Sequence, residues 1–422
     1  MSSVGKYVLK RIVYIVVVFF IVSFLMYSLY NLIPTDPARA QLEPMKQSLR
    51  PDEYNQMYRD LRRELGLDDP LFLRYLKWMG LFPAYGEVIV HAQDAQGNPI
   101  QGARYTIMIT DRDVTGKEEE RTFRTIETNA EGIAKQKTTY GTYKVIQISV
   151  PEGHTLDSTP RMIRTEGSLK GMLQGYFGFS EYFKSDVVNA VKEPIKNTMF
   201  INIFATIAAL GITIPLGIYT AVRKGSKFDS VTQTVTILGY SIPIYIISLI
   251  FMYFFVVRWR IFPLMGTKTP GAIYASSWEA FVDKLYHIAL PVIVMTFASL
   301  GGMTRYVRSS MIEALGTDYI RTARAKGVRE KVVIFSHAWR NALLPVITSI
   351  LGWFLSIFSG SVIIENTFSL NGMGRLYWIG LNNRDFELVL AIQMFYTIIS
   401  LLGVLLIDLS YGLVDPRVRV DK

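Results

Sequence analysis

The sequence predicts an α-helical membrane protein of six spans, with a small all-β sandwich inserted between the first two. Half of the 422 residues are hydrophobic. Apolar runs recur along the chain at the length of about 20 residues that a membrane span needs. Short stretches rich in β-branched residues cluster between residues 85 and 165 and predict the sandwich.

Each span is identified by its length and by the near absence of charged side chains. The apolar core of the first is too long for a signal peptide, and no small-residue cleavage pattern follows it, so we expect it to be retained. Three prolines, Pro215, Pro243 and Pro291, interrupt or bound the helices. The predicted spans are Val8–Ile33, Thr198–Val222, Val231–Val257, His287–Met303, Ala342–Ile364 and Leu388–Leu409.

The positive charge lies beside the spans. Residues 34–196 contribute −1 to the net charge of +10, since they hold 22 basic and 23 acidic side chains. The rest of the chain holds 23 basic and 12 acidic ones. This distribution indicates membrane topology and contact with lipid, and we expect no nucleic-acid partner.

Short loops predict the orientation. With the N-terminus inside, segments 1–11, 223–230, 305–341 and 413–422 carry 17 Lys or Arg in total. The short outer loops, 258–286 and 365–387, carry 6. The positive-inside rule therefore places both termini in the cytoplasm of a multi-pass cell-membrane protein. Residues 34–196 are then extracellular or periplasmic.

The chemistry of metals and thiols is not expected. The chain has no cysteine, and its histidines, His91, His154, His287 and His337, are scattered without ligand spacing. We expect no metal site and no catalytic residue. Carboxylates that could relay protons are also rare in the spans. Asp408 is the exception, and its place at the cytoplasmic end, near Arg417 and Arg419, favours an interfacial ion pair.

The sandwich is predicted from strands and turns. Val88–Val90, Tyr105–Ile109 and Tyr143–Val150 have strand composition, and Asp94–Asn98 and Asp113–Lys117 have turn chemistry. The pattern resembles prealbumin-like or Cna-B-type domains of surface proteins, which implies a rigid adhesion or spacer module. Either it docks a substrate-binding protein or shapes the vestibule, or it is a structural addition without contact to substrate. The turn motifs of the resemblance are Gly97–Ala103, Thr128–Gly132, Tyr140–Lys144 and Pro151–Gly153.

Loop 305–341 contains the most informative stretch. Thr317 or Asp318 can cap a short helix, and Gly327 can end it in the left-handed conformation. Such a helix suits a socket on a partner protein, and the alternative is a solvated basic helix on the inner leaflet. Small side chains at Ala323 and Ala325 are ringed by the cations Arg321, Arg324 and Lys326.

Six motifs lie along the chain outside the sandwich: Asn31–Ala38, Leu65–Leu71, Asp318–Gly327, Arg340–Pro345, Glu365–Gly374 and Asp415–Arg417. Together they resemble the B-type permease subunits of dipeptide and oligopeptide ABC importers. Tyr75–Trp78 and Gly175–Ser180 flank the sandwich, which splits a continuous segment of the family. The resemblance implies the fold of a type I importer permease.

The resemblance also implies a site. In that family this cytoplasmic loop carries the EAA motif, whose helix seats in a groove of an ATPase. Arg321 here stands at the position of the leading acid, and Arg340 replaces a typical proline, with Pro345 further on. The implied ATPase-coupling residues are Asp318, Arg321, Thr322, Ala323, Arg324, Ala325, Lys326 and Gly327.

The implied partners are a second, homologous permease, two cytoplasmic ATPases and an external solute-binding protein. No phosphate-binding Gly-x-x-x-x-Gly-Lys-Ser/Thr loop is present, so ATP and Mg²⁺ belong to the partners and this chain is no enzyme and binds no cofactor. The implied substrates are di- or oligopeptides, with oligosaccharides or metal chelates as alternatives. Candidate pore residues are Asn202, Ser241, Thr296, Ser359 and Gln393.

The predicted domains follow from these assignments. Residues 1–84 hold the first span and the start of the outer loop, 85–165 the sandwich, and 166–422 the permease core with coupling loop 305–341. Two rival functions are an ion-coupled transporter or channel, which would be indifferent to ATP, and a surface protein that uses its spans only to anchor the sandwich.

Overall fold

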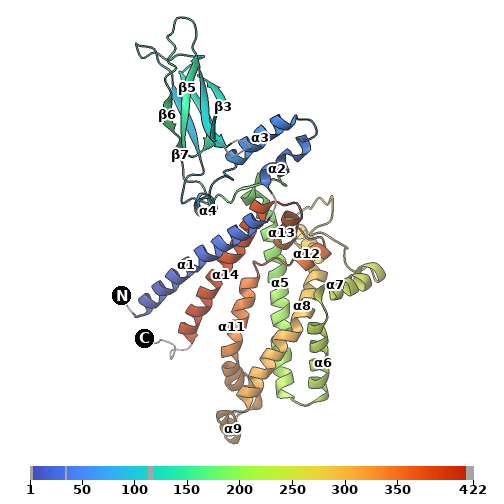
Figure 1. Cartoon of the computed structure of the whole chain (residues 1–422). Helices are drawn as coiled ribbons and strands as arrows, with labels where there is room; N and C mark the ends of the chain where they lie inside the picture. Colours follow the sequence, from blue (N-terminus) through green and yellow to red (C-terminus); the bar gives the residue numbers. More distant parts are fainter. Residues whose placement is uncertain (1–2, 34–35, 113–117, 415–422) are drawn as a thin grey trace. The chain divides into compact units, whose positions relative to one another are not determined.

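The computed structural model describes residues 3–33, 36–112 and 118–414 (Figure 1). The chain forms two compact units, one of residues 1–23 and 179–422 and one of residues 24–178, and helix α1 (Ser3–Leu32) runs from the first into the second. The predicted division at residues 84 and 165 remains a prediction. Outside the described residues lie the predicted turn Asp113–Lys117, Pro34 and Thr35 of the first motif, the motif Asp415–Arg417, and Arg419.

The larger unit is helical. A short β-ladder of β8 (Phe179–Ser180) and β9 (Ser185–Asp186) leads into it. Its helices are α5 (Val187–Val222), α6 (Lys227–Ser241), α7 (Ile244–Met252), α8 (Ser277–Leu315), α9 (Asp318–Ala325), α10 (Glu330–Val332), α11 (Arg340–Ser356), α12 (Val362–Thr367), α13 (Met373–Asn382) and α14 (Phe386–Val414), with the π-helical segments η3 (Tyr253–Arg258) and η4 (Val333–Trp339).

Four helices are long and apolar enough to cross a membrane: α1, α5, α8 and α14. Helix α6 and the segment Ile244–Arg258 pass the same test only together, so the described residues contain four candidate spans, or five with this bent pair. Helices α5 and α8 are much longer than predicted, with 36 and 39 residues, because polar turns extend their apolar runs at the ends.

The predicted span Val231–Val257 is wrong as a continuous helix. The chain bends by 101° between α6 and α7. Pro243 has no N–H to donate and disfavours a helical conformation at the residue before it, and Ile242 is indeed extended, with φ −82° and ψ 126°. Pro215 and Pro291, in contrast, lie inside continuous helices.

The predicted span Ala342–Ile364 is also divided. Helix α11 has 17 residues and ends at Ser356, before α12 begins at Val362. On its N-terminal side, however, α10, η4 and α11 follow one another without a break from Glu330 to Ser356.

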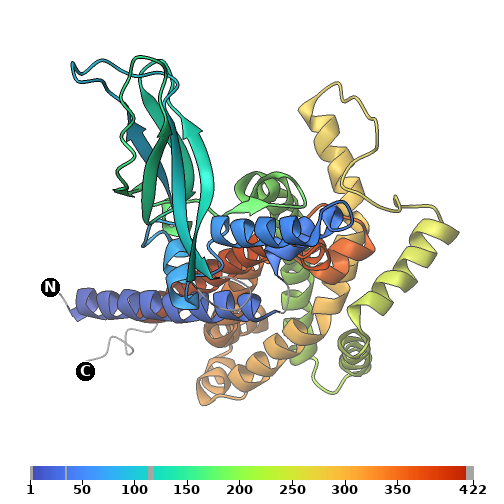
Figure 2. The ribbon, with the colours of Figure 1, turned by 45° about the horizontal axis from the view of Figure 1, so that its top comes forward.

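Helices α5 and α8 form the centre of this unit. Helix α8 packs along α5 and also contacts α6, α7 and α11 (Figure 2). Glycines permit the closest approaches: a Cβ on Gly217 would lie 2.7 Å from Cβ of Val307, and one on Gly301 would lie 2.7 Å from Cβ of Tyr240. Small residues at such crossings are typical of membrane helices.

The smaller unit contains the predicted antiparallel sandwich. One sheet has the order β4-β1-β7 and the other β3-β2-β5-β6, around an apolar core that includes Ile107, Phe123 and Val145. Strands β3 and β4 were not predicted, because their exposed faces are rich in charge. The strands are β1 (Tyr85–His91), β2 (Arg104–Arg112), β3 (Glu118–Glu127), β4 (Ile133–Thr139), β5 (Thr142–Ser149), β6 (Arg161–Arg164) and β7 (Glu166–Gly167).

Ion pairs fix the sandwich to helix α3. Asp60 of α3 lies 2.6 Å from Arg121 of β3, with both side chains largely buried, and Glu64 lies 3.0 Å from Arg124. The sandwich is therefore held to α3 (Pro51–Glu64), which precedes it in this unit. The unit also contains helices α2 (Pro37–Leu42) and α4 (Leu71–Met79) and the 3-10 turn η1 (Glu43–Met45) before the sandwich, and the 3-10 turn η2 (Met172–Gln174) after it.

Candidate coupling site

Helix α9 stands at the end of α8 and is held there by one buried side chain. Ile320 is completely buried, in a cluster with Met311 and Ala314 of α8 and Val333 of η4. Helix α8 and η4 thus enclose the inner face of α9.

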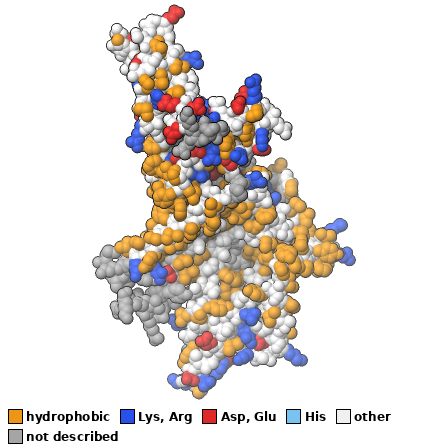
Figure 3. Space-filling model, viewed as in Figure 1, with side chains coloured by type: hydrophobic (Ala, Val, Ile, Leu, Met, Phe, Trp, Pro, Cys, Tyr) orange, Lys and Arg blue, Asp and Glu red, His pale blue; other side chains and the backbone are white. Residues whose placement is uncertain are grey.

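The exposed face of α9 is cationic. The side chains of Arg321, Arg324 and Lys326 are exposed, and Lys and Arg gather at the end of the unit where α9 lies (Figure 3). The sequence suggested that Ala323 and Ala325 form one small surface of the helix. In the structure these two alanines lie on different faces. Ala323 is partly buried against the core of this chain, one turn after Ile320, and only Ala325 is exposed. Asp318, Thr322 and Gly327 are exposed as well.

The ends of α9 follow the sequence prediction in part. Gly327 has φ +74°, which confirms the left-handed conformation after the helix. Thr317 occupies the N-cap position, but its side chain accepts no backbone hydrogen bond. Its hydroxyl donates instead to the carbonyl of Ala314, at 2.6 Å, and so ties the cap back to α8.

An ion pair shapes the far end of the loop. The guanidinium of Arg324 donates to both carboxylate oxygens of Glu330, at 2.6 and 3.1 Å. These hydrogen bonds hold the pKa of Glu330 below its ordinary value. Arg321 makes a longer contact with Asp318, at 3.3 Å between exposed groups, which contributes little. Arg324 is thus partly committed within the chain, whereas Arg321 is available to a partner.

Sequence reasoning missed an apolar patch beside α9. Tyr319, Val332 and Phe335 are 44%, 40% and 51% exposed. Tyr319 precedes the cationic stretch, and Val332 and Phe335 follow it. Large apolar side chains in an otherwise charged loop were the sequence signal that could have identified them. Exposed aromatic groups next to cations are the composition of interface centres.

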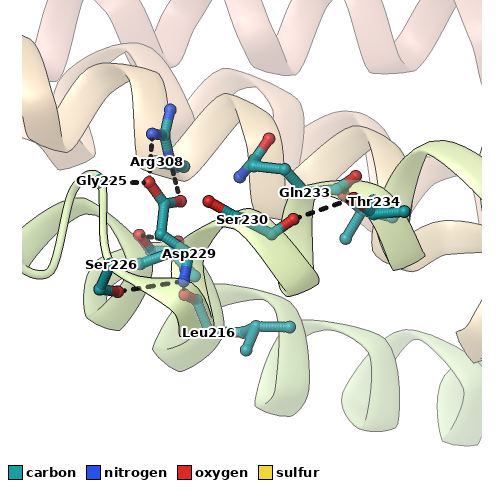
Figure 4. A network of polar contacts seen from close by, with 11 residues as sticks. Leu216, Gly225, Ser226, Asp229, Ser230, Gln233, Thr234 and Arg308 are labelled. Atoms are coloured by element: carbon teal, nitrogen blue, oxygen red, sulfur yellow. Dashed lines mark hydrogen bonds and ion pairs between the residues drawn. The ribbon is translucent and has the colours of Figure 1, made fainter.

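An ion pair with a buried carboxylate fixes α8 about three turns before α9 (Figure 4). Arg308 of α8 donates from Nε and Nη2 to the two carboxylate oxygens of Asp229 in α6, both at 2.8 Å. The amide of Gly225 also donates to Asp229, at 2.9 Å, and Ser226 caps α6. Asp229 is 4% exposed, so this pair locks α6 to the part of α8 that carries α9.

The pore candidates do not form one cluster of contacts. Asn202 is buried in α5, and its amide donates to the carbonyls of Ile357 and Ser359, at 3.0 and 2.9 Å. These hydrogen bonds join α5 to the segment that follows α11, so the amide of Asn202 has a structural role between two parts of the chain. Ser241 is exposed at the break after α6, and the side chain of Gln393 is partly buried in α14. The hydroxyl of Thr296 is buried and has no hydrogen-bond partner within the described residues.

Asp408 forms an ion pair, as expected, but with a partner that the sequence analysis did not name. Its carboxylate lies 3.2 Å from Arg11 of α1. Arg417 and Arg419, the neighbours in sequence, lie outside the described residues. The contact joins the first and last long helices of the chain near the two termini.

A second residue that sequence reasoning missed is Glu365. It is 3% exposed and accepts hydrogen bonds from the hydroxyl of Thr198, at 2.8 Å, and from the amide of Arg375, at 2.9 Å. The same hydroxyl accepts from the amide of Met373. A Cβ on Gly372 would lie 2.4 Å from the carboxyl carbon. The motif Glu365–Gly374 is therefore organised around one buried acid that ties α12 and α13 to α5.

Glu365→Gln is expected to remove a pH dependence of stability. Burial raises the pKa of Glu365 above its ordinary value of 4.5, although hydrogen bonds from Arg375 and Thr198 oppose this. The folded protein then holds the proton more tightly than the unfolded chain, so stability falls as the pH rises from 4.5 through the folded pKa. The wild-type Tm should fall relative to that of the variant over this range. If the difference in Tm between the wild type and Glu365→Gln stayed constant from about pH 4.5 to about pH 8, the raised pKa would not contribute to stability.

Comparisons with known proteins decide the family. Residues 213–420 match the binding-protein-dependent transport system inner membrane component, and residues 4–105 match the N-terminal membrane component of such systems. The oligopeptide transport system permease protein AppB of Bacillus subtilis (strain 168) is 36% identical over 262 residues, which cover 62% of this chain and 81% of AppB. The chain belongs to this permease family.

Two further relatives carry dipeptide names. The dipeptide transport system permease protein DppB of Bacillus subtilis (strain 168) is 32% identical, over 67% of this chain and 87% of its own. DppB of Escherichia coli (strain K12) is 34% identical, over 60% and 79%. As a permease of a binding-protein-dependent ABC importer, this chain is a multi-pass cell-membrane protein that depends on ATPase and binding-protein partners and lacks an ATPase site of its own.

The sandwich has a match of its own. Residues 86–169 match the prealbumin-like fold domain, which confirms the predicted resemblance. The ABC permease therefore carries an additional β-domain after its first helix.

Proposed function

We propose that this permease imports di- or oligopeptides and that α9 is the point at which its ATPases drive it. The observation that carries the second part is the geometry of α9. One face is anchored by the completely buried Ile320, and the other presents Arg321, Lys326 and the neighbouring apolar patch. A helix fixed to its own chain on one side transmits a displacement applied to the other side.

The topology is proposed to comprise six spans: α1, α5, α6 with its bent continuation, α8, the continuous stretch Glu330–Ser356, and α14. At about 1.5 Å per residue, the continuous stretch Glu330–Ser356 is longer than the hydrocarbon thickness of about 30 Å. Both termini and α9 then lie in the cytoplasm, and residues 34–196 lie outside. The excess of Lys and Arg on the inner loops supports this orientation.

Transport is proposed to proceed by alternating access. A second, similar permease completes the translocation path. Closure of two ATPases around ATP draws the α9 helices together, and the Asp229–Arg308 pair makes α6 follow α8. A solute-binding protein delivers substrate from outside.

The peptide substrate is supported by the relatives, whose names specify dipeptides or oligopeptides. The test is ATP-dependent uptake by vesicles that hold the complete importer. Labelled di- and oligopeptides should be taken up, and unlabelled peptides should compete in excess where oligosaccharides and metal chelates do not. Uptake of an oligosaccharide alone would replace the substrate while leaving the coupling intact, and uptake driven by an ion gradient without ATP would refute both.

A further inference from the structure

The segment after α6 leaves an apolar stripe uncovered. At Pro243 the chain turns by 101° and continues as α7 and η3, over Ile244–Arg258. One face of this segment packs on α8 and α12, where Ile247 and Ser248 are buried. The opposite face exposes six large apolar side chains, at intervals of one helical turn. They are Tyr245, Leu249, Ile250, Tyr253, Phe254 and Val257, between 43% and 58% exposed.

A helix that is apolar on both faces does not belong in water. Helix α6 has a similar apolar stripe, in which Val231, Val235 and Leu238 are exposed. In the proposed topology α6 lies in the bilayer, where an exposed apolar stripe is compatible with lipid. The same medium is therefore the first candidate to cover the stripe of α7.

The length of α6 gives the depth of α7. Its 15 residues rise by about 22 Å, whereas the hydrocarbon core is about 30 Å thick. If α6 starts at the inner boundary, the bend at Pro243 lies roughly 8 Å short of the opposite boundary. Interfacial helices bury their apolar faces about 5–10 Å into the boundary between headgroups and acyl chains.

The composition of the segment matches that depth. Tyr245 and Tyr253 lie on the stripe, and Trp259 follows at its end, 55% exposed. Arg258 and Arg260 flank this tryptophan and are exposed too. Tyr and Trp are enriched at the membrane interface, where cationic side chains reach the headgroups.

We propose that Ile244–Arg258 lies within the outer interface of the bilayer, parallel to the membrane, with the stripe from Tyr245 to Val257 in contact with lipid. Which leaflet is the outer one rests on the proposed topology. The depth rests on α6 crossing the bilayer, whichever leaflet it starts from. In this position the segment contacts α8 and α12 on one face and lipid on the other.

Single cysteines carrying a nitroxide label test this proposal directly, because the chain has no cysteine. The variants are Tyr245→Cys, Leu249→Cys, Tyr253→Cys and Val257→Cys in the complete importer, in vesicles of phosphatidylethanolamine and phosphatidylglycerol. Collision rates with oxygen and with a water-soluble nickel chelate give the depth of each label. The four depths should agree within one helical turn, about 5 Å, with strong oxygen access.

Matched labels on α6 provide the control. Val231→Cys, Val235→Cys and Leu238→Cys should differ in depth by about 10 Å from first to last. A gradient of about 18 Å from position 245 to 257 would show a crossing helix and overturn the proposal. Weak access to both reagents would show that protein covers the stripe, and strong access to nickel would place it in water. Either result refutes lipid contact, and neither bears on peptide uptake.

Discussion

Ala325→Trp is expected to reduce ATP-driven uptake by more than about tenfold while the permease still inserts and folds. Ala325 is exposed on α9 and tolerates a larger side chain without strain within this chain. In the proposed groove of the ATPase, however, the indole would prevent the helix from seating. Loss of about 1.4 kcal/mol of binding free energy already weakens the affinity tenfold. Uptake by vesicles and co-purification of the ATPases measure the effect.

Two control variants separate seating from folding. Gly327→Ala adds strain at φ +74° but no bulk, since nothing lies within 4 Å of the added Cβ, and should have a smaller effect on assembly. Lys224→Trp places the same indole at an exposed position in the loop before α6, outside both α9 and the apolar patch. Normal uptake by Ala325→Trp, or an equal loss in both tryptophan variants, would contradict a specific seat for α9.

Removal of one member of the Asp229–Arg308 pair is expected to have the largest effect on stability. Arg308→Ala leaves the carboxylate of Asp229, which is 4% exposed, with neutral donors such as the amide of Gly225 and without the cation that pairs with it. Breaking a buried pair typically costs about 3–5 kcal/mol, because the remaining charge is desolvated without compensation. The purified importer should lose a large part of its thermal stability, as measured by Tm in detergent.

The double variant identifies the cause. With Asp229→Asn and Arg308→Gln together, no unpaired charge remains, so much of the lost stability should return. Additive losses would show that the two side chains act separately. If the pair also couples α6 to α8, the double variant should regain its Tm but not its full transport rate.

The sequence predicted the membrane class and the family because both depend on local properties. Span length follows from bilayer thickness, and orientation follows from loop charges that can be counted. Gly327 was predicted to be left-handed from its position after a short helix, and its φ of +74° agrees. The strands with β-branched runs were found for the same reason, whereas β3, with its many charges, was not.

The candidate site was predicted only in part. The cationic residues of α9 could be named from the sequence, but the inward turn of Ala323 depends on where Ile320 packs. Tyr319 and Phe335 became visible as a patch only when η4 was placed beside α9. Glu365 and the Asp229–Arg308 pair were missed because their partners are far apart in the chain. Thr198 and Glu365 are 167 positions apart, and Asp229 and Arg308 are 79 positions apart.

By itself, the amino-acid sequence determined that this chain is a membrane protein. It also determined which segments are apolar enough to enter the bilayer and where a cationic helix lies between them. These properties arise from side chains within one or two turns of each other. The tertiary structure decided that Val231–Val257 bends instead of crossing straight, which acids are buried with partners, and which face of α9 is free. Those outcomes depend on packing between distant segments, where burial sets the energy of each polar group and no local pattern records its partner.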